Sequence, residues 1–342
     1  MKNKTKRSLS LIALAAVFLS GCANENPQAN ATSQNESTKS LTIYSGRSES
    51  LVAPLFEQFT AETGIQVEVR YGDSAEMSAT ILEEGANTPA DLFFSQDAGA
   101  LGALTKAGLF KVLPTETLEQ VAPKYRAKDG TWVGISGRSR VFNYNPELVT
   151  NVPTSVLELA NAEWKGRIAI APTNASFQSF VTGMRIELGD EKTQEFLNGL
   201  AKNAVSYEKN SQILDAVESG EVAAGLINHY YWYEKAAEVG SDAMKTKLAW
   251  FSAGDPGNLV NVAGVGVLSE NESAIQLVNW LLSKTAQSFF LEETFEYSLT
   301  QSAKPAESLP ALEEIGGPVI DLTDLATLAE TQTLLRNAGL IP

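Results

Sequence analysis

VAAGLINHYYWYEKAAE, residues 222–238, is the stretch from which this chain can best be read. Residues 222–227 form an apolar run that predicts a short buried strand, and residues 233–238 are typical of a helix start. Two adjacent tyrosines, Tyr230 and Tyr231, therefore lie where a strand passes into a helix. In open α/β sheets, ligands collect at the carboxyl ends of strands, so this junction is a candidate binding site.

The tyrosine pair suits a particular kind of ligand. A helix start carries exposed N–H groups and the positive end of the helix dipole, which favour a phenolate over a phenol. Two neighbouring phenolates suit a hard, highly charged cation, because such ions prefer oxygen ligands. The structural alternative is that both rings pack and hydrogen-bond, as tyrosines commonly do. Adjacent side chains on a helix point about 100° apart, so one core face does not easily take both rings.

Strands alternate with helices on both sides of this stretch, which predicts an α/β fold. Two extended segments, 132–136 and 138–144, interrupt the alternation, and 261–268 is a second long apolar strand. We expect segments 138–144 and 261–268 to be the two strands that cross from one lobe to the other. Each lobe should contain a mixed sheet flanked by helices. The predicted lobes are 41–140 plus 262–310 and 141–261 plus 311–342. The other expected elements are strands at 41–44, 65–70, 90–96 and 166–171, and helices at 51–64, 74–84, 176–188, 191–202, 211–219, 274–282 and 286–293.

The amino terminus has the pattern of a targeting segment. Residues 2–7 are basic and residues 9–19 are apolar but too short for a stable transmembrane helix. The sequence then reads Leu-Ser-Gly-Cys, which resembles a bacterial lipoprotein signal over residues 1–21 with Cys22 as the lipidated residue. The alternative is an ordinary signal peptide with a stray cysteine. Cys22 is the only cysteine, which excludes disulfides within one chain. Polar residues 22–40 predict a flexible tether.

Composition excludes several classes of protein. The 342 residues are enough for two domains, and the net charge of −15 argues against nucleic acid as a partner. We see no nucleophile elbow, P-loop or zinc-protease motif. His229 is the only histidine, which disfavours histidine-based catalysis and His-rich zinc or copper sites. We therefore expect a binding protein rather than an enzyme.

The signal, tether and two α/β lobes are the layout of a solute-binding protein for an ABC importer. Five segments follow one another from residue 41 onward: LTIYSGR (41–47), PADLF (89–93), SGRSRV (136–141), WKGRI (164–168) and NHYYW (228–232). In this order they resemble the ferric-ion-binding proteins of bacterial iron uptake. The resemblance implies a two-lobed, transferrin-like periplasmic-binding-protein fold of class II and Fe(III) as cargo. It also implies an ABC permease and ATPase as partners, a monomer, and a lipid anchor on the outer face of the cytoplasmic membrane.

The resemblance implies a ligand set for the metal. Tyr230 and Tyr231 match the two tyrosinate ligands of the family, and Tyr144 matches a third tyrosine that is a ligand in some branches. The positions that hold a bridging anion, such as carbonate, in certain members are Asn174, Ala175, Ser176 and Asn210 in this chain.

The sequence departs from the family at the positions where the first predicted lobe, 41–140 plus 262–310, would supply metal ligands. Ser48 stands where many members have a histidine ligand, Glu49 where some add a tyrosine, and Gln96 where others use a glutamate. Glu49 is the replacement ligand we favour. The alternative is that Ser48 and Glu49 form an ordinary helix cap.

Three other residues are candidates for supporting roles. Arg47 and Arg138 suit anion binding or phenolate stabilisation, because a guanidinium carries a fixed charge and several donors; the alternative is an ion pair. Ser136 lies in the same motif as Arg138. We expect His229 to stay off the metal, either behind the ligands or exposed.

Other functions remain open at this point. The same fold can bind a small organic or oxyanion solute, such as a polyamine, thiamine or a phosphonate, with Tyr230 and Tyr231 stacking on it. A sensory lipoprotein is a further alternative. Colour on addition of ferric iron separates the first alternative from a tyrosinate–iron site.

Overall fold

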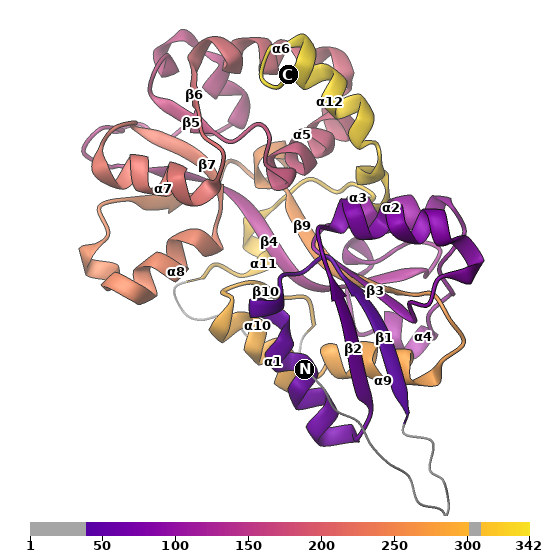
Figure 1. Cartoon of the computed structure of the whole chain (residues 1–342). Helices are drawn as coiled ribbons and strands as arrows, with labels where there is room; N and C mark the ends of the chain where they lie inside the picture. The colour runs from indigo at the N-terminus through magenta and orange to yellow at the C-terminus, as the bar shows by residue number, and fades with distance from the viewer. Residues whose placement is uncertain (1–38, 301–308) are drawn as a thin grey trace, which may run out of the picture. The chain divides into compact units, whose positions relative to one another are not determined.

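A mixed sheet of ten strands organises the residues that this computed structural model describes, 39–300 and 309–342 (Figure 1). The strand order is β2-β1-β3-β9-β4-β7-β5-β6, and β8 and β10 both pair with β4. Parallel pairs lie towards both edges, whereas β9 and β4 run antiparallel to their neighbours. The strands are β1 (Ser40–Ser45), β2 (Gln66–Tyr71), β3 (Leu92–Ser95), β4 (Trp132–Tyr144), β5 (Ile168–Ile170), β6 (Ala204–Ser206), β7 (Ala224–Asn228), β8 (Lys247–Ala249), β9 (Val260–Val267) and β10 (Tyr297–Ser298).

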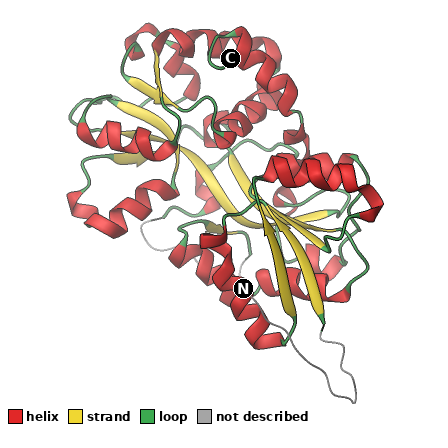
Figure 2. Ribbon diagram, in the orientation of Figure 1, coloured by secondary structure: helices red, strands yellow, loops and turns green. Residues whose placement is uncertain are grey.

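Helices flank this sheet, which confirms the predicted α/β class (Figure 2). They form where apolar residues recur at helical spacing; the first helix, for example, buries Val52, Leu55, Phe56 and Phe59 and ends at Gly64, whose φ is 75°. The helices are α1 (Glu49–Thr63), α2 (Ser74–Glu84), α3 (Ala98–Lys106), α4 (Thr115–Leu118), α5 (Ala175–Leu188), α6 (Asp190–Asn203), α7 (Asn210–Ser219), α8 (Tyr230–Val239), α9 (Glu272–Leu281), α10 (Lys284–Glu293), α11 (Leu312–Ile315) and α12 (Leu328–Asn337).

β4 is the long strand at the centre of the fold. The sequence predicts two segments, but the structure has one strand with a shift in register between Gly134 and Ser136. Such an irregularity bends a strand without ending it, and Gly137, which separates the two predicted segments, pairs with Val262 of β9. The first part of β4 pairs with β9, and its last residues pair with β7 and β8. β4 therefore connects the strands on the two sides of the sheet.

α8 begins three residues earlier than predicted. His229 already has helical angles, with φ −55° and ψ −40°, and its carbonyl accepts a hydrogen bond from Trp232 N at 3.1 Å. The helix therefore starts with the tyrosine pair instead of after it. Tyr230 and Tyr231 both lie in the first turn of α8 and directly follow the buried strand β7.

The carboxyl-terminal residues contact two distant parts of the chain. α12 packs against α5 and α6, whereas Leu322–Ala326 packs against α3. The second contact is so close that a Cβ at Gly102 would collide with Thr323 O. The predicted lobe boundaries place all of 311–342 with α5 and α6, and the segment 322–326 does not fit that assignment. The lobe boundaries themselves stay a prediction.

The targeting segment 1–21, Cys22 and nearly all of the tether lie outside the described residues. Their predicted roles therefore stay predictions. Within the described ranges, no helix has both the length and the apolar character needed to cross a membrane.

Candidate metal centre

The tyrosine pair lines a cavity. The rings of Tyr230 and Tyr231 stack with their centroids 4.4 Å apart and their planes 29° from parallel. Both residues line the same cavity of about 200 Å³. The two adjacent side chains therefore share one site, although ideal helical geometry would separate them by about 100°. The cavity is lined by Gln96, Asp97, Arg138, Asn174, Ala175, Ser176, Asn228, Tyr230 and Tyr231.

The sheet topology explains why these residues meet. Gln96 and Asp97 follow the carboxyl end of β3, and Asn228 ends β7 just before the tyrosines. Arg138 lies in the middle of β4, where it is paired with Asn261 of β9. Asn174 to Ser176 form the start of α5. The cavity therefore lies where strand ends and a helix start converge, as the fold class predicts.

Arg138 supplies a buried positive charge at this cavity. It is 2% exposed, and its Nη2 donates a hydrogen bond to Gln96 O. Its Nη1 makes no hydrogen bond to any described residue. Burial lowers the pKa of Arg138, while the charges of Glu296 and Tyr230 act in the opposite direction. A buried N–H group without a hydrogen bond is costly, and the carboxylate paired with this one is Glu296, whose Oε1 lies 3.9 Å away.

Burial makes the phenol of Tyr230 hard to deprotonate. Burial raises the pKa of Tyr230 well above that of a free phenol, and the neighbouring Tyr231 raises it further. Arg138 acts against both effects. Without a cation, Tyr230 is therefore a neutral phenol, and a phenolate at this position needs a positive charge beside it.

The start of α5 forms a polar wall of the cavity. Asn174 Oδ1 accepts hydrogen bonds from Ser176 N at 3.1 Å and from Ser176 Oγ at 2.6 Å. Behind them, Arg140 donates to Ser176 Oγ at 3.0 Å and to Asn210 Oδ1 at 3.3 Å. The structure thus brings Asn174, Ala175 and Ser176 to the cavity and places Asn210 directly behind them, buried. A helix start backed by a guanidinium favours an anion.

Arg47 and Ser136 do not reach the cavity. Arg47 forms a bidentate pair with Glu296, with both N–O distances 2.9 Å, and Ser136 Oγ donates to the same carboxylate at 2.6 Å. Arg138 Nη1 lies 3.9 Å from Glu296 Oε1. Burial alone would raise the pKa of Glu296, but Arg47, Arg138 and Ser136 outweigh it, so the pKa is lowered. Arg47 and Ser136 act on the site only through Glu296 and Arg138.

Tyr144 lies away from the tyrosine pair, which corrects the ligand set drawn from the resemblance. β4 and β7 are antiparallel, with Arg140 opposite Asn228 and Tyr144 opposite Ala224. Tyr144 is therefore at the amino end of β7, about 13 Å along the strand from the end that leads to Tyr230. Its ring stacks on Phe142, with the centroids 5.7 Å apart.

Ser48 and Glu49 are also absent from the cavity wall. Both are exposed at the start of α1, and Ser48 makes no side-chain cap hydrogen bond. Of the three predicted candidates on this side, only Gln96 lines the cavity. Glu49 does not line the cavity, so the structure gives it no contact with a metal there. Ser48 is the N-cap residue of α1, but its side chain makes no capping hydrogen bond.

His229 is buried, and both of its ring nitrogens have hydrogen-bond partners in the protein. The expectation of an exposed His229 is therefore wrong, whereas a place behind the tyrosines is compatible with the structure. Its Nδ1 accepts a hydrogen bond from Ser139 N at 3.2 Å, and its Nε2 lies 2.8 Å from Phe295 O. These partners assign the tautomer with the proton on Nε2. Burial lowers the pKa of His229 to about 4, so the ring is neutral near pH 7.

Sequence reasoning missed three residues of this site. Asp97 and Asn228 line the cavity, and Arg140 supports its polar wall. Asp97 directly follows the predicted strand 90–96, so an acid just beyond a strand end was the available signal. Asn228 and Arg140 are part of the motifs quoted above, but nothing in the sequence separates their roles from those of their neighbours.

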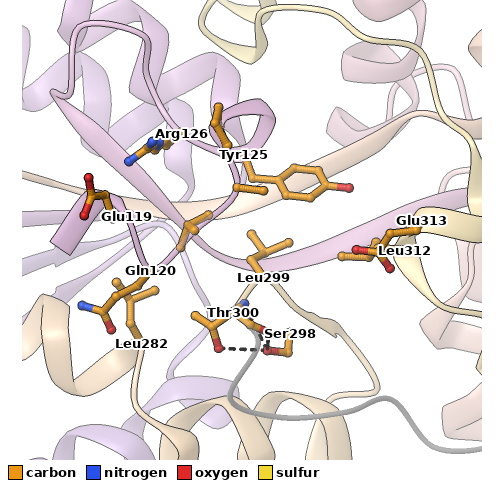
Figure 3. A pocket seen from close by; sticks show the side chains of 13 residues that line it. Glu119, Gln120, Tyr125, Arg126, Leu282, Ser298, Leu299, Thr300, Leu312 and Glu313 are labelled. Carbon is orange, nitrogen blue, oxygen red and sulfur yellow. Dashed lines mark hydrogen bonds between the residues drawn. The ribbon is translucent and has the colours of Figure 1, made fainter. Parts of the chain in front are cut away.

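A larger pocket of about 530 Å³ lies elsewhere, and Tyr125, Leu299 and Leu312 are among its lining residues (Figure 3). It shares no lining residue with the tyrosine cavity. Its walls include Thr300 and Leu312. These two residues lie before and after residues 301–308, which the structure does not describe. The larger of the two pockets is therefore not the one that contains the tyrosine pair.

The fold and this cavity define a solute-binding protein. The chain belongs to the family of bacterial extracellular solute-binding proteins, whose family model matches residues 87–322.

Several proteins to which the chain is similar are named for iron. The chain is 34% identical to the "Fe(3+)-binding periplasmic protein" of Serratia marcescens over 307 residues, which cover 88% of this chain and 90% of the relative. It is similar to the crystal structure of iron-bound HitA from Pseudomonas aeruginosa, with a TM-score of 0.81, 33% identity, and coverage of 88% of this chain and 99% of that one. A Trichodesmium protein in complex with iron and citrate ligands matches with a TM-score of 0.76 and 26% identity, covering 88% and 99%.

Proposed function

We propose that this protein captures ferric iron in the tyrosine cavity and delivers it to an ABC importer. The observation that carries the proposal is the stacked pair Tyr230 and Tyr231 in one cavity with the buried cation Arg138. The names of its relatives support the same cargo. Titration with ferric nitrilotriacetate tests the proposal: one equivalent gives a visible charge-transfer band, and a colourless protein that binds no iron contradicts it.

Both tyrosines bind as phenolates in this proposal. A free phenol has a pKa near 10, and a bound trivalent cation displaces the proton at neutral pH, as metals do with other protonated ligands. The positive end of α8 and the charge of Arg138 both favour the phenolate of Tyr230. Since burial opposes deprotonation in the metal-free site, loss of the proton is coupled to iron binding.

A bridging anion such as carbonate or citrate completes the shell on the side of α5. Asn174, Ala175 and Ser176 provide the polar wall, and Arg138, which lines the same cavity, provides the charge. The Trichodesmium relative with iron and citrate supports an anion of this class.

Iron delivery in this proposal depends on a difference in iron affinity between the closed and the open arrangement of the two lobes. Ligands from both sides of the cavity favour a closed arrangement of the two lobes, and opening releases the iron. The permease and ATPase of an importer recognise the loaded monomer. Scattering with and without iron tests the closure, since compaction on loading is expected and identical profiles contradict it.

Iron affinity should fall as the pH falls. In the proposed complex Tyr230 and Tyr231 each release one proton on binding, and the raised pKa of Tyr230 keeps that residue protonated in the metal-free site throughout the neutral range. Below that pKa, two released protons mean that affinity drops up to about 100-fold for each pH unit. Competition with a chelator of known pH dependence between pH 5 and 8 measures the slope; a slope of zero excludes phenolate ligands.

Cys22 should carry a lipid that holds the protein on the outer face of the cytoplasmic membrane. The motivation is the Leu-Ser-Gly-Cys sequence at the end of the signal segment. Cys22→Ala should move the protein from the membrane to the soluble fraction of fractionated cells. An unchanged membrane fraction contradicts the anchor but leaves the iron site untouched.

A further inference from the structure

Segment 295–297 contacts the start of α8, the helix that carries the tyrosine pair. Phe295 O lies 2.8 Å from Nε2 of His229, the residue directly before the pair. The ring of Tyr297 packs against the His229 ring, with the centroids 4.6 Å apart. The ring of Phe295 stacks on Tyr233 of α8, with the centroids 6.4 Å apart. Three contacts therefore join this segment to the first turns of α8.

The same segment also contacts the part of β4 that supplies the buried cation of the cavity. Glu296 Oε1 lies 3.9 Å from Nη1 of Arg138, and Tyr297 pairs with Gly137 in the ladder between β10 and β4. Arg138 and the tyrosine pair line one cavity but come from different elements, β4 and α8. Segment 295–297 therefore connects the two elements that supply these residues to the site.

Phe295 has a backbone conformation that is unusual for its residue type. Its φ is 53°, and among the described residues it is the only one other than glycine with a positive φ. A bulky residue adopts this region at an energetic cost, and such a conformation persists only where the surrounding contacts hold it. The contacts here include the bond between Phe295 O and His229, and the bond from Glu296 N to Phe290 O at 3.0 Å. The unusual conformation therefore goes together with the contact to His229.

His229 is held from its other side by β4. Its Nδ1 accepts a hydrogen bond from Ser139 N at 3.2 Å, and its own backbone N–H donates to Ser139 O at 3.0 Å. With Nδ1 as the acceptor, Nε2 carries the proton and donates it to Phe295 O. The imidazole ring is fully buried and bridges β4 and segment 295–297. The residue that precedes the tyrosine pair is therefore fixed by bonds to two other parts of the chain.

We propose that His229 is a positioning residue for the ferric site, because its bond to Phe295 O fixes the start of α8, and with it the tyrosine pair, relative to Arg138. The inference rests on the proposed ferric function. A metal site needs its ligands at defined positions, and supporting hydrogen bonds provide them. Tyr230 and Tyr231 occupy the first turn of α8, so a shift of His229 displaces both of them at once. His229 itself binds no metal in this account.

Three substitutions of His229 separate its two side-chain bonds. His229→Phe keeps a ring and removes both bonds. His229→Gln places an amide N–H group near the position of Nε2, for Phe295 O, whereas His229→Asn places an oxygen near the position of Nδ1, for Ser139 N. Trp232→Phe is the matched control, because it removes a ring N–H bond from the same helix to another backbone carbonyl, Thr246 O at 3.1 Å. Each purified protein is titrated with ferric nitrilotriacetate, and the affinity, the position of the visible band and the thermal midpoint are recorded.

We expect His229→Phe to lose at least about 10-fold in ferric affinity and to displace the visible band, because the loss of a group that supports a metal ligand typically costs about 10–100-fold. His229→Gln should restore most of the affinity and the parent band, whereas His229→Asn should resemble His229→Phe. Trp232→Phe should lower the thermal midpoint and keep the parent affinity and band. A purely structural role for His229 predicts instead that the affinity follows the thermal midpoint in all four variants.

The inference is overturned if His229→Phe keeps the parent affinity and band, or if Trp232→Phe loses as much affinity as His229→Phe. It is also overturned if His229→Asn restores the site and His229→Gln does not, because the bond to Ser139 is then the one that matters. This last comparison decides the question even where His229→Phe does not fold. These outcomes differ from a failure of the proposed function, in which the parent protein itself binds no iron and has no visible band.

Discussion

Tyr230→Phe and Tyr231→Phe should each abolish the coloured ferric complex and weaken ferric binding by more than about 100-fold. Each substitution keeps the ring, the stacking and the packing and removes only the ligand oxygen. The expected loss exceeds the 10–100-fold typical of residues that merely support a ligand. Chelator competition and the visible spectrum measure both effects.

Tyr144→Phe is the matched control for these variants. Tyr144 lies opposite Ala224, at the far end of β7, and its ring stacks on Phe142. We expect it to keep the parent colour and affinity. If Tyr144→Phe loses iron while Tyr230→Phe does not, the ligand set taken from the geometry of the cavity is wrong.

Glu296→Gln should destabilise the fold far more than the removal of an exposed charge. Glu296 is 3% exposed and joins Arg47, Ser136 and Arg138, so its loss leaves two guanidinium groups buried beside a neutral amide. Removing one partner of a buried ion pair costs about 3–5 kcal/mol. Urea unfolding measures the loss. We also expect weaker ferric binding, because Arg138 loses a neighbour that holds it at the cavity.

The exposed pair Lys111–Glu270 supplies the control for Glu296. Its partners are 46% and 86% exposed, so Glu270→Gln should change stability by less than about 1 kcal/mol.

The pH dependence of stability gives a second check on the role of Glu296. Because the folded pKa of Glu296 is lowered, its contribution is present above the unfolded value near 4.3 and is lost as the pH falls through the folded value. The stability difference between parent and Glu296→Gln should therefore shrink in acid; a difference that is constant with pH contradicts this account.

The local pattern was enough to predict the tyrosine pair. An apolar run followed by two tyrosines and a helical segment places both residues at a strand end, and the structure confirms that position. The alternation of strands and helices likewise predicts the mixed sheet and helices such as α2 within a residue of their bounds. These features depend on contacts between residues that are close in sequence.

The remaining parts of the site depend on contacts that the sequence does not contain. The partner of Arg47 is Glu296, which is 249 residues away. Tyr144 was assigned to the ligand set from the resemblance. The register of β4 against β7 places it at the opposite end of β7 from the tyrosine pair, and this register cannot be read from the sequence of one strand. Asp97 was overlooked because its place at the cavity depends on which strand ends converge, whereas Glu49 was favoured only for its position in a motif.

Resonance Raman spectroscopy of the iron-loaded protein, excited in its visible band, tests the central claim most directly. Tyrosinate ligands from Tyr230 and Tyr231 should give enhanced phenolate ring and C–O vibrations, which disappear in a Tyr230→Phe, Tyr231→Phe double variant. Iron-loaded protein without phenolate vibrations, or a double variant that keeps them, would contradict a ferric site built on this tyrosine pair.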